Sequence, residues 1–413
     1  MTIHWIGTGL SSVPGLRRLL AEGRKVTVWN RELDVAQAAV GDLTDDIHGF
    51  SLDDIRAAVR PGDTVVSMLP ADLHPGIAEL CLDAGANFVS SSYISPAMAA
   101  MDARARDAGV ALVNEVGLDP GIDHLMAHDL VADYRQIAQP GDVVSFTSYC
   151  GGIPRHPNPF RYKFSWSPLG VLRALRAPSR SIRGGADRVV ERPWHAIEPY
   201  DAPLPTPERF EIYPNRDSTE FIDHYGFDPQ WTLHDFVRGT IRLKGWSEAW
   251  ADIFAEVEGL TGPEGDVRLQ QMADELWASH AYDPQEPDRV VLFVRLRAER
   301  DGAAVFDKEW VLDAQGSDKG LDRGSGKGSG KGSGKGPHTG AQTGSAMARL
   351  VSNPVALAAA AVDGGAFPPG VHAAPDDPLM VGDWLAEVGH VADHMAKVNH
   401  MDETPQVMRP ESR

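Results

Sequence analysis

Residues 2–20 read TIHWIGTGLSSVPGLRRLL and join an apolar run to a helical pattern through a turn of small residues. Gly7 permits a tight turn after the apolar run, and Gly9 lets the backbone approach a pyrophosphate at the helix N-terminus. Ser12 stands where the third glycine of the GxGxxG fingerprint normally lies, and it is small enough for close helix–strand packing. The stretch therefore predicts a dinucleotide-binding turn that opens an α/β domain.

The same alternation of strand and helix patterns continues to about residue 119. Buried strand patterns recur at residues 25–29, 64–69, 87–91 and 110–116, and helical patterns lie at 52–59, 74–84 and 96–108. This rhythm predicts a doubly wound parallel sheet of the Rossmann type. Farther on, strand patterns at 143–149, 240–243, 290–296 and 303–312 and helical patterns at 123–134, 246–257 and 268–279 predict a second, α+β domain.

These patterns divide the chain into residues 1–120 for the dinucleotide-binding domain, 121–344 for the α+β domain and 345–413 for a C-terminal segment. The Gly-Ser-Lys tract at about 316–340 predicts a flexible loop. Residues 345–362 predict an apolar helix that Pro354 interrupts, and residues 381–400 predict an amphipathic helix. His390, His394 and His400 do not share one helical face and no cysteine accompanies them, so we expect no metal site there or elsewhere.

Charge and composition narrow the classes of partner. The chain has 413 residues, 58 of them acidic and 39 basic, and its formal net charge is -19. This balance argues against a nucleic-acid partner and against an anionic membrane surface, whose phosphates attract basic proteins. The two cysteines, the absence of a signal-peptide pattern at the N-terminus and the lack of a long apolar stretch lead us to expect a cytoplasmic protein without a membrane partner.

The end of the second strand pattern bears on which nicotinamide cofactor would bind. NAD sites usually carry an acidic residue there for the ribose hydroxyls. Here the run ends with Asn30 and Arg31, and an arginine can pair with a 2′-phosphate. We therefore expect NADP, although Glu32 is adjacent and Arg31 could instead be an ordinary surface residue.

Several longer motifs give the sequence a family resemblance. They run in order over most of the chain: SMLPADLHP (67–75), SSSYISPAM (90–98), NEVGLDPGIDH (114–124), SFTSYCGGIP (145–154), YKFSWSPLGVL (162–172), YPNRDS (213–218), RGTIR (238–242) and SAMAR (345–349). With them the sequence resembles the saccharopine reductase family, the glutamate-forming saccharopine dehydrogenases. The resemblance implies an NADP-dependent oxidoreductase of lysine metabolism that acts on the CH–NH group of saccharopine. It also implies a homodimer and a C-terminal segment that returns to the Rossmann domain.

The resemblance also assigns roles to individual residues. Beside Gly7 and Gly9, the expected cofactor contacts are Leu10, Ser11, Ser12, Asn30, Arg31, Glu32, Leu69, Ser91, Ser92, Leu118, Asp119, Pro120 and Ser167. The expected substrate contacts are Ser92, Tyr93, Asp119, Arg216, Thr240, Ile241 and Arg242. Saccharopine carries three carboxylates, which the two arginines could clamp.

Asp119, Tyr93 and Cys150 are the expected catalytic residues, because imine formation and hydrolysis need proton transfers beside the amine. Asp119 is the first candidate for those protons and Tyr93 the second. Each has a structural alternative, namely a turn cap for Asp119, core packing for Tyr93 and an inert buried thiol for Cys150. Two other functions remain open: an opine or carboxyspermidine-type dehydrogenase, and a non-catalytic NADP-binding regulator.

Overall fold

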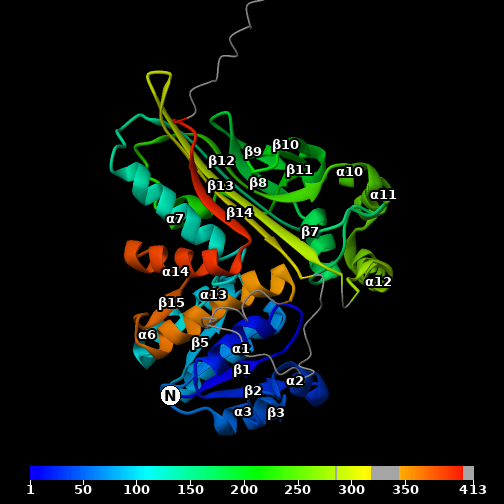
Figure 1. The fold of residues 1–413 in the computed structure, drawn as a ribbon, viewed down its shortest axis with the longest axis vertical. Coiled ribbons are helices and arrows are strands. Elements are labelled where there is room, and N and C mark those ends of the chain that lie inside the picture. Colours follow the sequence, from blue (N-terminus) through cyan, green and yellow to red (C-terminus); the bar gives the residue numbers. More distant parts are fainter. Residues whose placement is uncertain (284–285, 318–343, 403–413) are drawn as a thin grey trace, which may run out of the picture.

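The computed structural model describes residues 1–283, 286–317 and 344–402, and it contains two sheets that pack against each other through shared helices (Figure 1). One continuous apolar core joins them, since Trp5 and Leu16 of the first part belong to the same buried cluster as Leu292 of the second and Leu350 of the C-terminal segment. The predicted Gly-Ser-Lys loop lies outside the described residues. Among the helices described, none combines the length and apolarity that a bilayer crossing requires.

The first sheet is parallel and has seven strands in the order β15-β6-β5-β4-β1-β2-β3. The strands are β1 (Ile3–Ile6), β2 (Val26–Asn30), β3 (Ile47–Gly49), β4 (Thr64–Ser67), β5 (Asn87–Ser90), β6 (Ala111–Val113) and β15 (Gly370–His372). The order reverses beside β1, where a doubly wound sheet opens the crevice for a ligand. The Rossmann-type sheet predicted from the sequence is therefore confirmed.

Six helices connect the strands of this sheet. They are α1 (Val13–Ala21), α2 (Leu33–Val40), α3 (Leu52–Ala58), α4 (His74–Ala84), α5 (Pro96–Ala99) and α6 (Asp102–Ala108). Gly85 and Gly109 end α4 and α6 in the left-handed conformation that a glycine cap favours. The single helix predicted for residues 96–108 is divided into α5 and α6 at Ala100 and Met101.

The second sheet is mixed and has nine strands, with β10-β11-β12-β7-β13-β14-β16 as its main order and β8 and β9 beside β12. The strands are β7 (Val143–Pro154), β8 (Ser179–Arg183), β9 (Ala186–Val190), β10 (Glu198–Ala202), β11 (Glu208–Pro214), β12 (Thr232–Leu243), β13 (Asp288–Arg300), β14 (Ala303–Gln315) and β16 (His394–Asn399). β12 and β7 are parallel, whereas the other neighbours on the main path run antiparallel.

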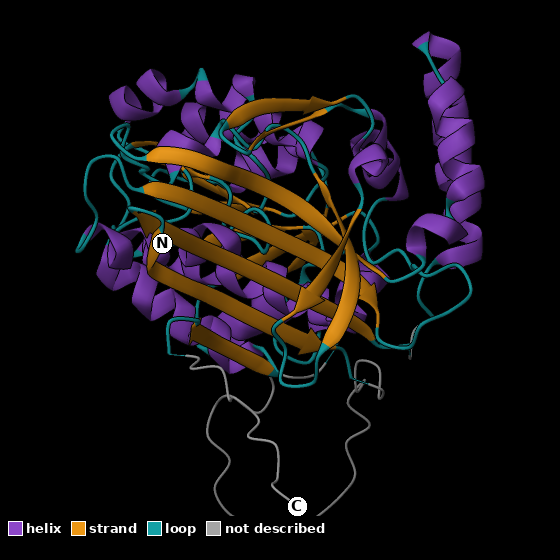
Figure 2. Cartoon of the chain, turned by 90° about the horizontal axis from the view of Figure 1, so that it is seen from above, coloured by secondary structure: helices purple, strands orange, loops and turns teal. Residues whose placement is uncertain are grey.

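Helices cover one face of this second sheet more fully than the other. α7 (Ile122–Arg135) packs on β13 and β14, while Figure 2 looks onto the opposite face, where the long strands lie in front. Other helices are α8 (Pro168–Arg176), α9 (Phe221–His224), α10 (Trp246–Ala249), α11 (Ala251–Gly259), α12 (Gly262–His280) and α14 (Pro378–Val391). We call the face toward α7 and the Rossmann sheet the inner face, and the opposite face the outer face.

The C-terminal segment contributes to both sheets. α13 (Ala346–Asp363) runs through Pro354 and packs against α1, β4 and β5. β15 extends the first sheet, whereas β16 pairs with β14 of the second. The helix predicted for residues 381–400 is therefore wrong beyond Val391, because the exposed edge of β14 offers backbone hydrogen bonds that draw residues 394–399 into a strand.

α1 and α13 approach each other closely at Gly15. Its backbone N–H donates a hydrogen bond to Ser352 Oγ at 2.8 Å, and a Cβ atom at this position would lie 2.0 Å from the Ser352 carbonyl oxygen. A side chain here would thus force the two helices apart. Glycine allows the C-terminal helix to lie directly on the helix that follows the dinucleotide-binding turn.

We predict that Gly15→Ala lowers the free energy of unfolding by about 1–3 kcal/mol, the usual cost of overpacking a tight contact. Denaturant unfolding would measure the loss. Gly76→Ala in α4 is the matched control, since a Cβ atom there meets nothing within 4 Å. Equal stability of Gly15→Ala and Gly76→Ala would show that the contact tolerates a methyl group.

Candidate active site

The dinucleotide-binding turn is held by its own side chains. Gly7 has a φ of +97°, and Ser12 Oγ donates a hydrogen bond to the Gly7 carbonyl at 2.6 Å. Trp5 Nε1 in turn donates to Ser12 Oγ at 2.8 Å, so the hydroxyl of Ser12 shapes the turn. A Cβ atom at Gly9 would meet nothing within 4 Å, and Leu10 is 58% exposed. The turn therefore leaves an open backbone surface at the start of α1, and this surface fits a pyrophosphate.

The loop after β2 lies directly beside this turn. Asn30 Oδ1 accepts a hydrogen bond from the Thr8 backbone N–H at 3.1 Å, and Asn30 Nδ2 donates to the Glu32 carbonyl at 2.7 Å. The side chain of Arg31 is 87% exposed, and its Nε lies 3.2 Å from Glu32 Oε1. Asn30 thus orders the loop, while the guanidinium of Arg31 is accessible to an anionic group.

The residues expected around the nicotinamide come from three neighbouring loops and one distant helix. Gly117 packs on Ser91, because a Cβ atom at Gly117 would lie 2.8 Å from Ser91 Cβ. Ser92 Oγ lies 3.0 Å from His74 Nε2, and Leu69 follows the end of the neighbouring strand β4. Ser167 instead caps α8, where its Oγ accepts the Gly170 N–H at 3.2 Å.

Strand β12 aims its charged side chains at the inner face. Because side chains alternate along a strand, Arg238, Thr240 and Arg242 share one face, and Thr240 is the register partner of Cys150. Cys150 belongs to the core that continues into the Rossmann part, whereas Ile241 packs in a separate core on the outer face. The structure therefore brings Thr240, Arg242 and Cys150 to one face and places the side chain of Ile241 on the other.

A single guanidinium nitrogen of Arg238 contacts side chains from three other segments of the chain. Its Nη2 donates to Asp123 Oδ2 at 2.6 Å, to Asp119 Oδ1 at 2.7 Å and to the Tyr93 hydroxyl oxygen at 3.1 Å. The Tyr93 hydroxyl donates in turn to Asp119 Oδ1 at 2.9 Å. Arg238 also lies over the Phe221 ring at 3.9 Å. We call Tyr93, Asp119, Asp123 and Arg238 the carboxylate network.

The pKa values of the two carboxyl groups in this network, Asp119 and Asp123, are shifted in opposite directions. Burial, and then the charge of Asp123, raises the pKa of Asp119. Burial opposes ionisation of Asp123 too, but His124 and Arg238 together hold the pKa of Asp123 below its usual range. Burial raises the pKa of the Tyr93 hydroxyl well above its usual value, and burial together with the charge of Asp119 raises the pKa of the Cys150 thiol well above its usual value. Asp119, whose pKa is raised while that of Asp123 is lowered, is thus the carboxyl group of the network that accepts a proton more readily.

Arg242 lies in an aromatic cage on the same face. Its guanidinium carbon is 4.7 Å from the Tyr162 ring centre, 5.3 Å from Trp246 and 5.5 Å from Tyr213. The residue is 5% exposed, and it makes no ion pair with a carboxylate within the described ranges. A buried cation of this kind is a candidate ligand for a substrate carboxylate.

Arg216 has a different setting from Arg242. It is exposed and its backbone has a φ of +56°. Its guanidinium carbon lies 5.1 Å from the centre of the Tyr93 ring. The residue can therefore reach an anion bound above Tyr93 from the solvent side.

The sequence reasoning missed Arg238 and Asp123. Both lie inside motifs that carried the resemblance, RGTIR and NEVGLDPGIDH, and Arg238 shares its strand parity with Thr240 and Arg242. This alternation along the strand could have identified Arg238 as a residue on the same face as Thr240 and Arg242. The same segment also contains Glu115 and His124, which lie near His224 beside the carboxylate network.

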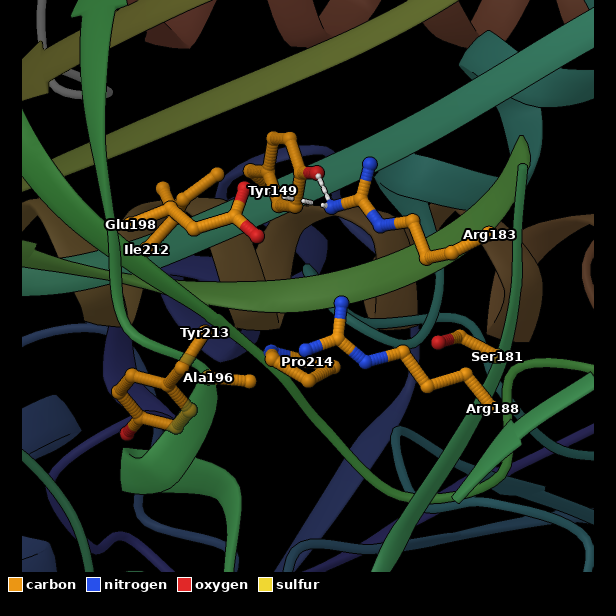
Figure 3. Close-up of a pocket in the computed structure, with 9 residues that line it drawn as sticks. All are labelled: Tyr149, Ser181, Arg183, Arg188, Ala196, Glu198, Ile212, Tyr213 and Pro214. Atoms are coloured by element: carbon orange, nitrogen blue, oxygen red, sulfur yellow. Dashed lines mark hydrogen bonds and ion pairs between the residues drawn. The ribbon is translucent and has the colours of Figure 1, made fainter. Parts of the chain in front are cut away.

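Cavities on the outer face do not coincide with the carboxylate network. Figure 3 shows a small one, where Arg183 donates to the Tyr149 hydroxyl at 2.9 Å and Arg188 points to the same opening. A larger cavity continues along β7 and β13 past Arg295. Tyr149 alternates with Cys150 on β7, so these cavities and the carboxylate network lie on opposite faces of the sheet.

We predict that Arg238→Met lowers the free energy of unfolding by about 3–5 kcal/mol, because it leaves the buried carboxylate of Asp123 and the half-buried carboxylate of Asp119 without their cation. In this variant the folded-state pKa of each carboxyl rises above its unfolded value, so the penalty is full at neutral pH and fades as pH falls. Urea unfolding at pH 7 and pH 5 would measure both effects. Arg268→Met, at an exposed ion pair, should change stability little at either pH.

Comparison with known proteins agrees with this architecture. Residues 3–113 match the saccharopine dehydrogenase NADP binding domain and residues 117–391 the saccharopine dehydrogenase C-terminal domain. The mitochondrial alpha-aminoadipic semialdehyde synthase of Rattus norvegicus is 38% identical over 49% of this chain and 22% of its own length. The saccharopine dehydrogenase [NADP(+), L-glutamate-forming] of Saccharomyces cerevisiae is 36% identical over 59% of this chain and 55% of its own length.

These alignments span less than two thirds of either relative. The structural match is more extensive. A solved structure of apo saccharopine dehydrogenase (L-Glu forming) from Saccharomyces cerevisiae superposes with a TM-score of 0.74 at 25% identity, covering 96% of this chain and 99% of that one. With both domain models matched in order, the chain belongs to the saccharopine dehydrogenase family and carries the family's NADP-binding domain.

Proposed function

We propose that this protein is an NADP-dependent, glutamate-forming saccharopine dehydrogenase of lysine metabolism. The reaction converts saccharopine, NADP and water to glutamate, 2-aminoadipate 6-semialdehyde, NADPH and a proton, and it is reversible. The names of the relatives and the family's NADP-binding domain support the proposal. The caged guanidinium of Arg242 carries the proposal, because it has no carboxylate partner among the described residues and, on the inner face, suits a substrate with several carboxylates.

The cofactor would lie along the edge of the first sheet. The open turn at Gly9 would receive the pyrophosphate, and Arg31 would pair with the 2′-phosphate. NADP, when bound, supplies the acceptor for the hydride that leaves the carbon of the CH–NH bond. Leu69, Ser91 and Leu118 would line the nicotinamide end of this path.

The carboxylate network would manage the protons. Loss of hydride from carbon gives an imine, which water attacks to form a carbinolamine that then breaks into the aldehyde and the amine of glutamate. Each of these steps moves a proton at or beside the nitrogen. Asp119, whose pKa burial raises, would take and return that proton, while Tyr93 and Arg238 hold its carboxylate in place. Cys150 would contact the substrate as a neutral thiol.

Binding of the substrate would use residues on both sides of the interdomain space. Arg242 and Arg216 would hold carboxylates, with Thr240 beside them and Ser92 on the Rossmann side. A polyamine substrate, as in a carboxyspermidine-type enzyme, calls for acidic groups instead, and the carboxylates of Asp119 and Asp123 are already paired with Arg238. This pairing favours the more anionic substrate.

The sequence patterns and the family resemblance together support three further proposals. The domains would be residues 1–120 for NADP, 121–344 for substrate and dimerisation, and 345–413 for the segment that links them. The protein would act as a homodimer in the cytoplasm. Sedimentation of the purified protein would test the oligomeric state.

The first test is turnover of saccharopine with NADP, followed by absorbance of the reduced nicotinamide. We expect rapid NADPH formation with saccharopine and little with carboxyspermidine. Tight NADP binding without turnover of saccharopine would contradict the proposed reaction and favour another substrate or a non-catalytic role.

We predict that Arg31→Leu lowers kcat/KM for NADP by about 10–100-fold, the loss expected for one charged hydrogen-bonded contact of about 1.5–3 kcal/mol. The value for NAD should not fall, since NAD has no 2′-phosphate. Arg104→Leu removes an exposed arginine paired with Glu79 on α4 and serves as the control. Equal losses with NADP and NAD would argue against the assigned phosphate contact.

We predict that Arg242→Met lowers kcat/KM for saccharopine by about 10–100-fold, because the flexible side chain fills the cage but cannot bind a carboxylate. The affinity for NADP, measured by fluorescence titration, should remain unchanged. Arg183→Met on the outer face is the matched control and should retain activity. Loss of activity in Arg183→Met but not in Arg242→Met would move the site to the outer face.

A further inference from the structure

Three potential metal ligands gather beside the carboxylate network, from three separate segments. Glu115 follows β6, His124 lies in the first turn of α7 and His224 is the last residue of α9. One ligand atom from each lies within 4.8 Å of the other two. The proposed dehydrogenase reaction uses none of these side chains. We call Glu115, His124 and His224 the histidine cluster.

The distances between the potential ligand atoms of the cluster are slightly longer than, or similar to, those expected around a bound metal ion. Glu115 Oε2 lies 3.0 Å from His124 Nε2 and 3.9 Å from His224 Nε2. Ligand atoms bound to zinc at about 2.0–2.1 Å in a tetrahedral arrangement lie roughly 3.3 Å apart. Small side-chain rotations would therefore bring all three atoms to one ion.

The outer contacts of the cluster hold two of the ligands in position. His124 Nδ1 lies 2.8 Å from the Tyr225 hydroxyl and 3.5 Å from Asp123 Oδ2, so its Nε2 faces the cluster. Glu115 Oε1 accepts the Ile94 backbone N–H at 2.8 Å, which leaves Oε2 for the cluster. Glu115 also holds a φ of +58°, a backbone conformation uncommon for residues other than glycine. Metal-binding histidines commonly have such second contacts.

A hydrogen bond between His124 and Glu115 explains only part of this arrangement. It satisfies those two side chains but leaves His224 Nε2 buried without a hydrogen-bond partner among the described residues. Buried polar atoms rarely stay unpartnered in folded proteins. A cation shared by the three side chains would pair all of them at once.

We propose that Glu115, His124 and His224 bind one divalent transition-metal ion, with Zn²⁺ as the preferred ion. Two imidazole nitrogens and one carboxylate oxygen form a ligand set typical of zinc, and three protein ligands leave a fourth position open. The ion would join the end of the Rossmann sheet to α7 and α9 of the second domain. This is contrary to our expectation from the sequence of no metal site, because Glu115 and His124 share one motif but His224 comes from a distant part of the chain.

The first experiment measures metal binding without substrate or NADP. Untagged protein is freed of metal with a chelator and titrated with Zn²⁺ against a chromophoric chelator. We expect one equivalent of Zn²⁺ per chain and a higher unfolding temperature with Zn²⁺ than without it. Co²⁺ in place of Zn²⁺ should give visible absorption bands of a tetrahedral site. Absence of competitive binding overturns the proposal.

Variants then locate the ion. His224→Ala and Glu115→Gln should each weaken Zn²⁺ affinity at least tenfold, and Tyr225→Phe, which removes only the outer contact of His124, should weaken it by about 10–100-fold. His195→Ala, at a histidine on the second domain whose side chain is 58% exposed, should bind as the wild type does. Unchanged affinity in both His224→Ala and Glu115→Gln means that the ion lies elsewhere and overturns the proposal. Circular dichroism confirms that each variant is folded.

Discussion

The buried guanidinium of Arg238 is the constraint on which the interdomain site depends. It comes from the second sheet, yet its partners Asp119, Asp123 and Tyr93 come from the loops and helix that follow the Rossmann strands. Burying two carboxylates is costly unless a cation and hydrogen bonds compensate them. Asp123 belongs to the second domain with Arg238, whereas Asp119 and Tyr93 belong to the first, so the contacts of Arg238 with Asp119 and Tyr93 constrain how the two domains meet. Burial of the shared apolar core stabilises the contact between the two domains, while the hydrogen bonds of Arg238 define their relative position.

Much of the fold could be predicted from local patterns, because strands and helices of a doubly wound sheet carry strong hydrophobic periodicity. Residues 381–400 show where that reasoning fails. Their helical spacing is real up to Val391, but the edge of β14 offers hydrogen bonds to the rest of the segment, and sequence spacing carries no information about such a distant edge. The same limit applies to the site. Asp119 and Arg242 could be selected from motifs, whereas the contact between Arg238 and Asp119 joins residues far apart in the chain.

The alternation of side chains along β12 determines which of the expected site residues can line the same site. Arg242 and Thr240 lie on the inner face with Cys150, but Ile241 between them belongs to the outer core with Tyr149. A run of neighbouring residues in a strand therefore cannot line one site, except through its backbone. The same alternation separates the outer cavities from the carboxylate network. A cavity on the outer face, however large, has a whole sheet between it and Asp119.

The charge balance of the carboxylate network explains why its two aspartates differ. With Asp119 and Asp123 both ionised, one guanidinium faces two negative charges in a buried site. Adding one proton makes the group neutral. That proton goes to Asp119, because Asp123 has a second stabilising neighbour in His124 and accepts the Gly121 N–H at 2.7 Å. Asp119, with its raised pKa, consequently accepts a proton more readily than Asp123, whose lowered pKa favours the carboxylate that holds Arg238. A pair of carboxylates on one arginine thus yields one structural anion and one group able to exchange protons with a bound amine.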